Sequence, residues 1–158
     1  MKRLKNKKGF TLVELLAVIV VLAIVMGLAV VGITSVLEST RKSAFAADAN
    51  SYIEGARALV RADEAIVMLG GTSAYTPACN KTTPQNKSIT IDKIKLDSGG
   101  KSPYGYAYSN SSFVKVVSTY SGGTCSYTYF IYLTDGTFSI GTSSSPVASA
   151  NVNGSAVN

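Results

Sequence analysis

The chain has 158 residues, a formal net charge of +6, no histidine and two cysteines. This composition excludes acid–base catalysis by histidine and the usual zinc sites built from cysteine and histidine. The sequence also lacks a glycine-rich loop of the P-loop type, so most enzyme classes are disfavoured.

The basic residues are concentrated at the N-terminus. Five of the fifteen lysines and arginines precede Gly9, and the rest of the chain carries ten basic against nine acidic residues. The net charge therefore does not indicate a broad phosphate-binding surface. A short basic cluster before an apolar segment instead follows the positive-inside rule, which holds the N-terminus in the cytoplasm.

The segment that follows is long and apolar enough to cross a membrane. From Leu15 to Ile33, nineteen consecutive residues lack a polar side chain, and a helix of that length spans about 28 Å. Glu14 stands directly before this run. A charge at the centre of a spanning helix costs roughly 2.5–3.5 kcal/mol, and less near an interface, so Glu14 is expected to have a partner and a function.

Two interpretations of this segment leave features unexplained. A secretory signal peptide has a shorter apolar core and a small-residue cleavage site directly after it, but here ten residues separate the run from Ala44-Phe45-Ala46. A plain membrane anchor explains the apolar run and the basic flank. It gives no role to Glu14 or to the Gly9-Phe10 pair.

The third interpretation rests on the stretch KKGFTLVELL. Basic residues, Gly9, Phe10 and Glu14 resemble in order and spacing the class III leader of type IV prepilins, a similarity that covers residues 7–32. The resemblance implies that a prepilin peptidase cuts between Gly9 and Phe10 and methylates Phe10 as the new N-terminus. It also implies that Glu14 of an incoming subunit neutralises the Phe10 amine of its neighbour, an attraction that a low-dielectric setting strengthens.

The helix is expected to continue beyond the membrane segment to about Ala62. Phe45, Tyr52 and Leu59 recur every seven residues, which predicts an apolar helix face packed on a globular core. An irregular region follows, and then five stretches rich in β-branched and aromatic residues predict a meander of three or four antiparallel strands. These stretches are ITIDKIKL, YGYAYS, FVKVVSTY, CSYTYFIYLT and TFSIG, with turns expected at Gly122-Gly123 and Asp135-Gly136.

Both cysteines lie beyond the membrane segment, outside the reducing cytoplasm, where disulfides persist. A small head gains much from a covalent link, so the sequence favours a Cys79–Cys125 disulfide over two buried free thiols. Such a bridge would contribute on the order of 4 kcal/mol.

The expected fold is α+β, a long N-terminal helix packed on a small antiparallel β-meander, as in type IV pilins. The expected division is a cleaved cytoplasmic leader (1–9), a transmembrane and polymerisation helix (10–37), an amphipathic second half of the helix (38–62), a globular head (63–142) and a polar tail that is mobile or an exposed cap (143–158). The expected location is the cytoplasmic membrane, as a single-pass protein with its N-terminus inside, and after assembly an extracellular fibre.

The resemblance implies a structural subunit of a type IV pilus, with no enzymatic activity, no cofactor and no metal. The implied partners are other pilin subunits, the prepilin peptidase, the membrane, and an assembly platform with its ATPase; no specific nucleic-acid site is evident. Fibres of this family serve adhesion, aggregation, twitching motility or DNA uptake.

Two alternatives stay open. One is a pseudopilin of a type II secretion or competence system, some of which carry a calcium loop of clustered carboxylates near the C-terminus. Only Asp135 supplies a carboxylate side chain in the last 60 residues, which favours a pilin. The other alternative is a membrane-anchored binding domain that does not polymerise.

Overall fold

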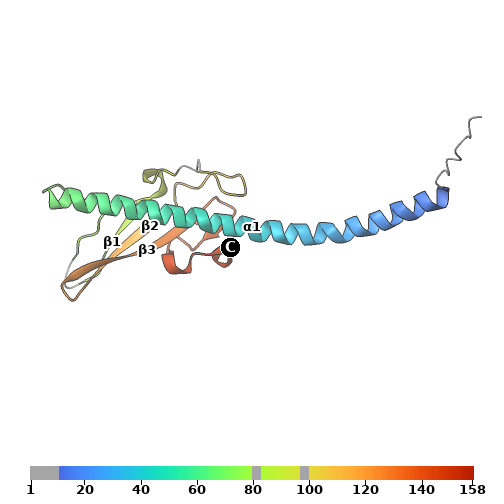
Figure 1. The fold of residues 1–158 in the computed structure, drawn as a ribbon. Helices are drawn as coiled ribbons and strands as arrows, with labels where there is room; N and C mark the ends of the chain where they lie inside the picture. Colours follow the sequence, from blue (N-terminus) through green and yellow to red (C-terminus); the bar gives the residue numbers. More distant parts are fainter. Residues whose placement is uncertain (1–10, 80–82, 97–99) are drawn as a thin grey trace, which may run out of the picture. The chain divides into compact units, whose positions relative to one another are not determined.

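The computed structural model describes residues 11–79, 83–96 and 100–158, with the side chains of residues 29–32 left out. One long helix, α1 (Leu12–Met68), precedes a small antiparallel sheet (Figure 1). The strands are β1 (Gln85–Thr90), β2 (Phe113–Ser121), β3 (Thr124–Thr134), β4 (Ser139–Ile140) and β5 (Val147–Ala148). The 3-10 helices are η1 (Ile91–Lys93), η2 (Ser149–Asn151) and η3 (Gly154–Ala156). This is the expected α+β architecture of the type IV pilin fold.

The chain divides into two compact units, residues 1–38 and 39–158, so that α1 contributes to both. The first unit, as far as it is described, is helix alone. The second unit is the head, in which the C-terminal part of α1 lies against β1, β2 and β3 (Figure 1).

The helix does not end near Ala62, as the sequence suggested, but continues to Met68. Nothing in the intervening residues breaks a helix, and the first strong stop signal is the glycine pair at 70 and 71. Gly70 takes a φ of +86°, its N–H donates to Val67 O at 3.0 Å, and the N–H of Gly71 donates to Ile66 O at 3.0 Å. These two bonds form a Schellman motif, which satisfies carbonyl groups at the helix end.

The strand order is β1-β2-β3-β4, with β5 paired to β3 beside this path. The longest pairing joins β2 to β3, from Phe113 opposite Tyr132 to Ser121 opposite Thr124. Gly122 and Gly123 connect the two strands with φ of +58° and +86°, the left-handed conformation that a two-residue hairpin turn requires. The hairpin therefore forms where the sequence predicts it.

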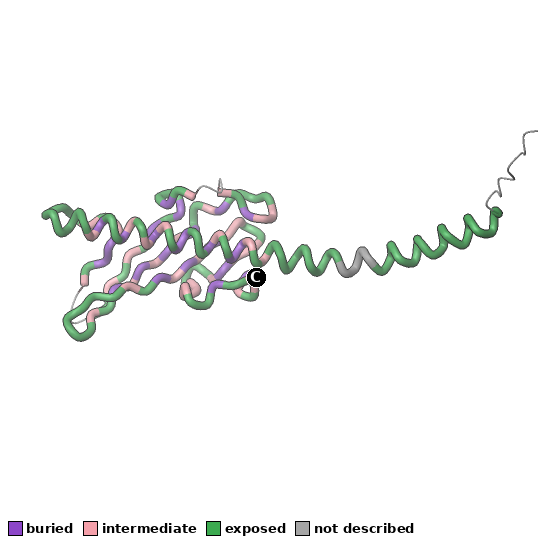
Figure 2. The backbone as a smooth tube through the Cα atoms, viewed as in Figure 1, coloured by how far each residue is buried: buried purple, intermediate pink, exposed green. Residues whose placement is uncertain are grey.

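The core lies between α1 and one face of the sheet. The predicted helix face is confirmed, because Phe45 is 0% and Tyr52 is 4% exposed and Leu59 is partly buried against the same cluster. The cluster also includes Ala46, Ala49, Ile53, Ala56 and Val60 of the helix, and Ile89, Val114, Val116, Tyr129, Ile131, Leu133 and Ile140 of the strands. Figure 2 shows these buried residues on the strands and on the second half of α1, within the head.

Three of the five predicted strand stretches are mostly not strand, and of TFSIG only Ser139 and Ile140 belong to a strand, β4. Of ITIDKIKL, only Ile89 and Thr90 belong to β1, which begins earlier, at Gln85, and η1 follows directly. The stretch YGYAYS forms a tight turn in which Gly105 N–H donates to Ser102 O and Ser102 N–H donates to Tyr106 O, both at 2.8 Å. Pro103 favours such a turn over a paired strand, whatever the alternation of tyrosines indicates.

The last sixteen residues are packed onto the head and are not a mobile tail. Val152 and Val157 are 9% and 3% exposed, and Val147 and Ala148 pair with β3. Asn158 exchanges two backbone hydrogen bonds with Ser139, at 2.9 and 3.0 Å. The segment was expected to have little to bury because its composition is polar. Its two buried valines pack in the core, and its backbone at Asn158 pairs with β4.

Candidate functional site

The two residues expected at the cleavage point, Gly9 and Phe10, lie outside the described part of the chain, which begins at Thr11. Cleavage after Gly9 and methylation of Phe10 therefore stay predictions. What the structure describes of the N-terminal site is the first turn of α1 and the apolar helix surface that follows it.

Thr11 and Glu14 form a capping box at the start of α1. The Glu14 carboxylate oxygen Oε2 accepts hydrogen bonds from the Thr11 backbone N–H and the Thr11 hydroxyl, both at 2.8 Å, while the Glu14 N–H donates to Thr11 Oγ1 at 3.3 Å. The motif arises because a threonine at the N-cap and a glutamate three residues later satisfy each other's backbone donors. The sequence TLVE before an apolar run carries this signal. Glu14 is thus at the site that the sequence indicated, and Thr11 is a residue of that site that was not predicted.

The capping box fixes where the Glu14 carboxylate lies. Both Thr11 bonds go to Oε2, and Oε1 accepts no hydrogen bond from the residues that the structure describes. One oxygen thus orders the helix terminus while the other is available to a further donor. The negative charge also stands at the helix N-terminus, where the macrodipole favours it.

Replacing Thr11 with valine is expected to open the first turn of α1, because the hydroxyl that Glu14 binds is removed at nearly constant side-chain volume. Losing such an N-cap costs about 1 kcal/mol, which corresponds to roughly fivefold faster exchange of the backbone amides at positions 11 and 14. Hydrogen exchange on the full chain in uncharged detergent micelles measures this effect. Thr11→Ser keeps the hydroxyl and serves as the control with wild-type exchange; equal protection in Thr11→Val would contradict the role of the cap.

Beyond the capping box, α1 presents apolar side chains on every side. The exposed fractions of the first four large apolar side chains are 80% for Leu12, 73% for Val13, 63% for Leu15 and 54% for Leu16. The other large apolar side chains up to Leu28 are exposed as well (Figure 2). Mean hydropathy reaches 3.1 over eighteen residues, so that by length and composition α1 can cross a membrane. A helix with apolar residues all round needs lipid or protein around it.

In the head, Cys79 and Cys125 form the disulfide that the sequence favours, across 46 residues. The bridge ties the loop after α1 to the start of β3. It thereby holds a segment that contributes few side chains to the core.

Asp63 anchors the same loop without a covalent bond. Its side chain is 3% exposed, and three consecutive backbone N–H groups donate to it, from Ala74, Tyr75 and Thr76 at 2.8, 3.1 and 2.7 Å. The Ser73 hydroxyl also donates to Oδ2, at 2.9 Å. We call this arrangement the Asp63 clasp. No motif in the sequence predicts the Asp63 clasp, because an aspartate near a helix end is common and carries no specific signal.

Removing both cysteines is expected to lower the free energy of unfolding of the head by about 2–4 kcal/mol, because the unfolded loop regains its freedom. All nine tyrosines lie beyond residue 51 and the chain has no tryptophan, so tyrosine fluorescence of the full chain in detergent reports on the head. The comparison is between Cys79→Ser/Cys125→Ser and wild type under increasing denaturant, with reduced wild type as the control. Complete alkylation of both thiols without prior reduction would contradict the bridge itself.

Within residues 11–79, 83–96 and 100–158, no group of three histidine, cysteine, aspartate or glutamate side chains is placed to hold a metal ion.

Comparison with known families finds a match at the N-terminus of the chain. Residues 4–30 match the family described as the prokaryotic N-terminal methylation motif, which is the class III leader of type IV pilins and pseudopilins. No curated protein and no solved structure matches over the chain. The N-terminal motif and the α+β fold together support a type IV pilin-like or pseudopilin-like precursor, a type of structural subunit. The leader and the apolar helix fit a precursor anchored in a membrane.

Proposed function

We propose that the protein is a structural subunit of a type IV pilus. In this proposal the precursor is cut between Gly9 and Phe10, Phe10 is methylated, and α1 holds the subunit in the cytoplasmic membrane until it enters a surface fibre. The observation that carries the proposal is the carboxylate of Glu14, held in a capping box at the start of the apolar first part of α1, inside a methylation motif.

The apolar surface of α1 supports polymerisation. Water is a poor environment for a helix with exposed leucine, valine and isoleucine on all sides, whereas lipid and a bundle of identical helices both accept it. Extraction of the helix from the membrane therefore has a low free-energy cost only if the helix passes directly into the centre of a fibre. The head would face outward.

Glu14 supports a specific contact within that bundle. A carboxylate among packed apolar helices is costly without a positive partner. The new amine of Phe10 on a neighbouring subunit is such a partner, and Oε1 of Glu14 is free of bonds to the described residues. The capping box would keep the carboxylate at the level of the helix terminus, where that amine would arrive.

Mass spectrometry of the mature protein tests the processing step. We expect a chain that begins with methylated Phe10, and an uncut precursor in the membrane when Gly9 is replaced by a bulky residue, because the peptidase must approach that backbone closely. A mature chain that still begins at Met1, or that begins at Ala47 after a signal-peptide cut, would refute the proposal.

Electron microscopy with an antibody to residues 100–140 tests the assembled form. Labelled long surface filaments are the result expected of a pilus subunit. Labelling of short structures in the periplasm would indicate a pseudopilin. Diffuse labelling of the cell envelope would indicate an anchored domain that does not polymerise.

A further inference from the structure

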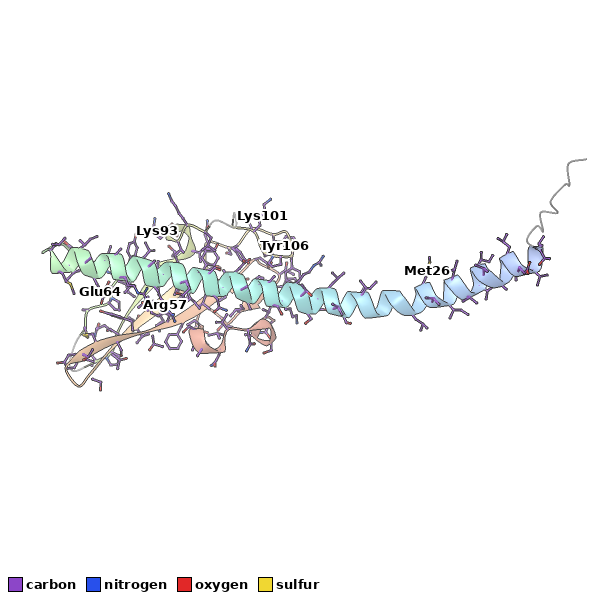
Figure 3. The ribbon with its side chains drawn as sticks, viewed as in Figure 1. Met26, Arg57, Glu64, Lys93, Lys101 and Tyr106 are labelled. Carbon is purple, nitrogen blue, oxygen red and sulfur yellow. A yellow bond between two sulfur atoms is a disulfide. The ribbon has the colours of Figure 1, made fainter. Side chains whose placement is uncertain are left out.

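A polar pocket of about 310 Å³ lies in the head between α1 and the beginning of β3. Its polar lining comes from Arg57, Arg61 and Glu64 of α1 and from Ser126, Tyr127 and Tyr129 of β3, beside Val60 and Cys125. Figure 3 shows Arg57 and Glu64 on the edge of α1 that adjoins the strands. We call this the Arg57–Arg61 pocket. Nothing in the pilin assembly described above uses it.

The Arg57 side chain is held in place by two contacts. Its Nη1 donates to Glu54 Oε1 at 3.0 Å, and its guanidinium carbon lies 5.1 Å from the centre of the Tyr129 ring. A guanidinium has five N–H donors in a planar fork, and these contacts use one of them. Arg57 is thus oriented while most of its donors stay available.

Arg61 lies one helical turn further along α1, on the same side as Arg57. Its guanidinium makes no hydrogen bond or ion pair with any residue in the described part of the chain. Both arginines are close enough to the Tyr129 hydroxyl to interact with it electrostatically, and so are the carboxylates of Glu54 and Glu64. Arg57 and Arg61 therefore flank the same end of the pocket, together with these two carboxylates.

We propose that the Arg57–Arg61 pocket binds a tetrahedral oxyanion, a phosphate or a sulfate group. Two arginine forks match the oxygens of such a group better than they match a single-atom anion. The Tyr129 hydroxyl offers a further donor to oxygens that project out of the plane of either fork, whereas the hydroxyls of Ser126 and Tyr127 already bind Thr119 O and Glu64. The lining holds two arginines and Glu64, and Glu54 outside it pairs with Arg57, so Arg61 is the cation of the lining without an ion pair among the described residues.

A single site of this kind binds weakly, with a dissociation constant on the order of millimolar. In the fibre of the proposed function the pocket would recur on every subunit, and a polymer carrying many phosphate or sulfate groups would bind through many weak sites at once. The fibre would thereby adhere to anionic polymers on a surface. Only this consequence rests on the proposed function; the pocket itself belongs to the single subunit.

The arginine side chains provide a direct measurement. The chain has four arginines, and Arg41 is a natural reference: its guanidinium lies 5.8 Å from the ring centre of Tyr104, as Arg57 does over Tyr129, but it does not line this pocket. The experiment follows the Nε–Hε resonances of the full chain in uncharged detergent during titration with sodium phosphate, sodium sulfate and, at matched ionic strength, sodium chloride. We expect Arg57 and Arg61 to shift together and to saturate with phosphate or sulfate, while Arg41 follows the chloride titration.

Three variants test the assignment. Arg61→Gln is expected to weaken binding about tenfold, since a charge-assisted hydrogen bond is lost. Arg41→Gln removes the same charge elsewhere on α1 and is expected to leave binding unchanged. Glu64→Gln removes the repelling carboxylate and is expected to tighten binding about threefold.

A preference between phosphate and sulfate would identify the source of the group, and either preference supports the pocket. Shifts that do not saturate, that chloride reproduces, or that Arg41→Gln reduces as much as Arg61→Gln would overturn it. Because the measurement uses the unassembled chain, its failure would leave the pilus proposal untouched, and a failure to form filaments would leave the pocket untouched.

Discussion

Replacing Glu14 with alanine is expected to give a subunit that is cleaved normally and held in the membrane but forms few or no filaments. Removing one partner of a buried ion pair destabilises the assembled state by about 3–5 kcal/mol, which is enough to reduce filament yield to about a hundredth or less. Membrane insertion should not suffer, since a costly charge is removed from the edge of the apolar run. The Asp63 clasp and the disulfide both lie far along the chain from Glu14, so the head should fold as in wild type.

The capping box makes alanine alone an ambiguous test, because Glu14→Ala removes both the charge and the hydrogen bonds to Thr11. Glu14→Gln separates the two roles. A glutamine at this position of a capping box still accepts from the Thr11 N–H, but it carries no charge to neutralise the Phe10 amine. We therefore expect Glu14→Gln to keep the first turn of α1 and to lose filaments as Glu14→Ala does.

The measurement is an immunoblot of protein sheared from the cell surface against protein in the membrane fraction, for wild type and both variants. The mass of the mature N-terminus is measured in parallel, so that a processing defect is not mistaken for an assembly defect. Filament yield of Glu14→Gln equal to wild type would show that Glu14 acts only as a helix cap.

The sequence was sufficient for the parts of the fold that repeat with a regular period or carry a fixed motif. The heptad of Phe45, Tyr52 and Leu59 places the buried face of α1 because side chains seven residues apart share one side of a helix. The hairpin at Gly122-Gly123 follows because two glycines suit a left-handed turn between two strand-like runs. The leader was recognisable because its residues stand at fixed spacing.

The parts that the sequence did not predict depend on contacts between distant or unpatterned residues. The Asp63 clasp joins a helix side chain to backbone groups 11 to 13 residues later, and backbone N–H groups leave no trace in a sequence. The packed C-terminus depends on Val152 and Val157, two isolated apolar residues among polar ones. The Tyr104–Ser109 stretch alternates like a strand, yet Pro103 and the bonds around Ser102 fold it into a turn.

The Asp63 clasp is expected to make the largest contribution to head stability of any single polar side chain that we have described. Its carboxylate satisfies three backbone N–H groups of one loop. Alanine at this position leaves those donors without a partner, and each buried unsatisfied donor costs about 1–3 kcal/mol. We expect Asp63→Ala to lower the free energy of unfolding of the head by roughly 3–5 kcal/mol, as much as loss of the disulfide or more.

The clasp also predicts how head stability depends on pH. Burial alone would raise the pKa of Asp63, but the hydrogen bonds from Ala74, Thr76 and Tyr75 outweigh it and hold that pKa well below its ordinary value of 3.8. The unfolded chain therefore binds a proton at Asp63 at a higher pH than the folded chain does. Its stabilisation is complete above about pH 5 and is lost progressively as the pH falls below about 4 toward the lowered pKa.

Denaturant unfolding of the full chain in uncharged detergent, followed by tyrosine fluorescence between about pH 2 and pH 7, tests both expectations. Asp63→Ala should unfold at lower denaturant at neutral pH and should lose much of the wild-type decline in stability below about pH 4, because the group responsible for it is absent. Asp92→Ala is the matched control, since the Asp92 side chain is half-exposed, its contacts with Thr90 and with Lys93 (3.1 Å) are local, and the change should alter stability by less than about 0.5 kcal/mol. Hydrogen exchange at the amides of Ala74, Tyr75 and Thr76 locates the effect: these amides should lose protection in Asp63→Ala while those of β2 opposite β3 lose protection only with global unfolding. Wild-type stability in Asp63→Ala, or an unchanged pH profile with equal protection at these amides, would show that the loop is held by the disulfide alone.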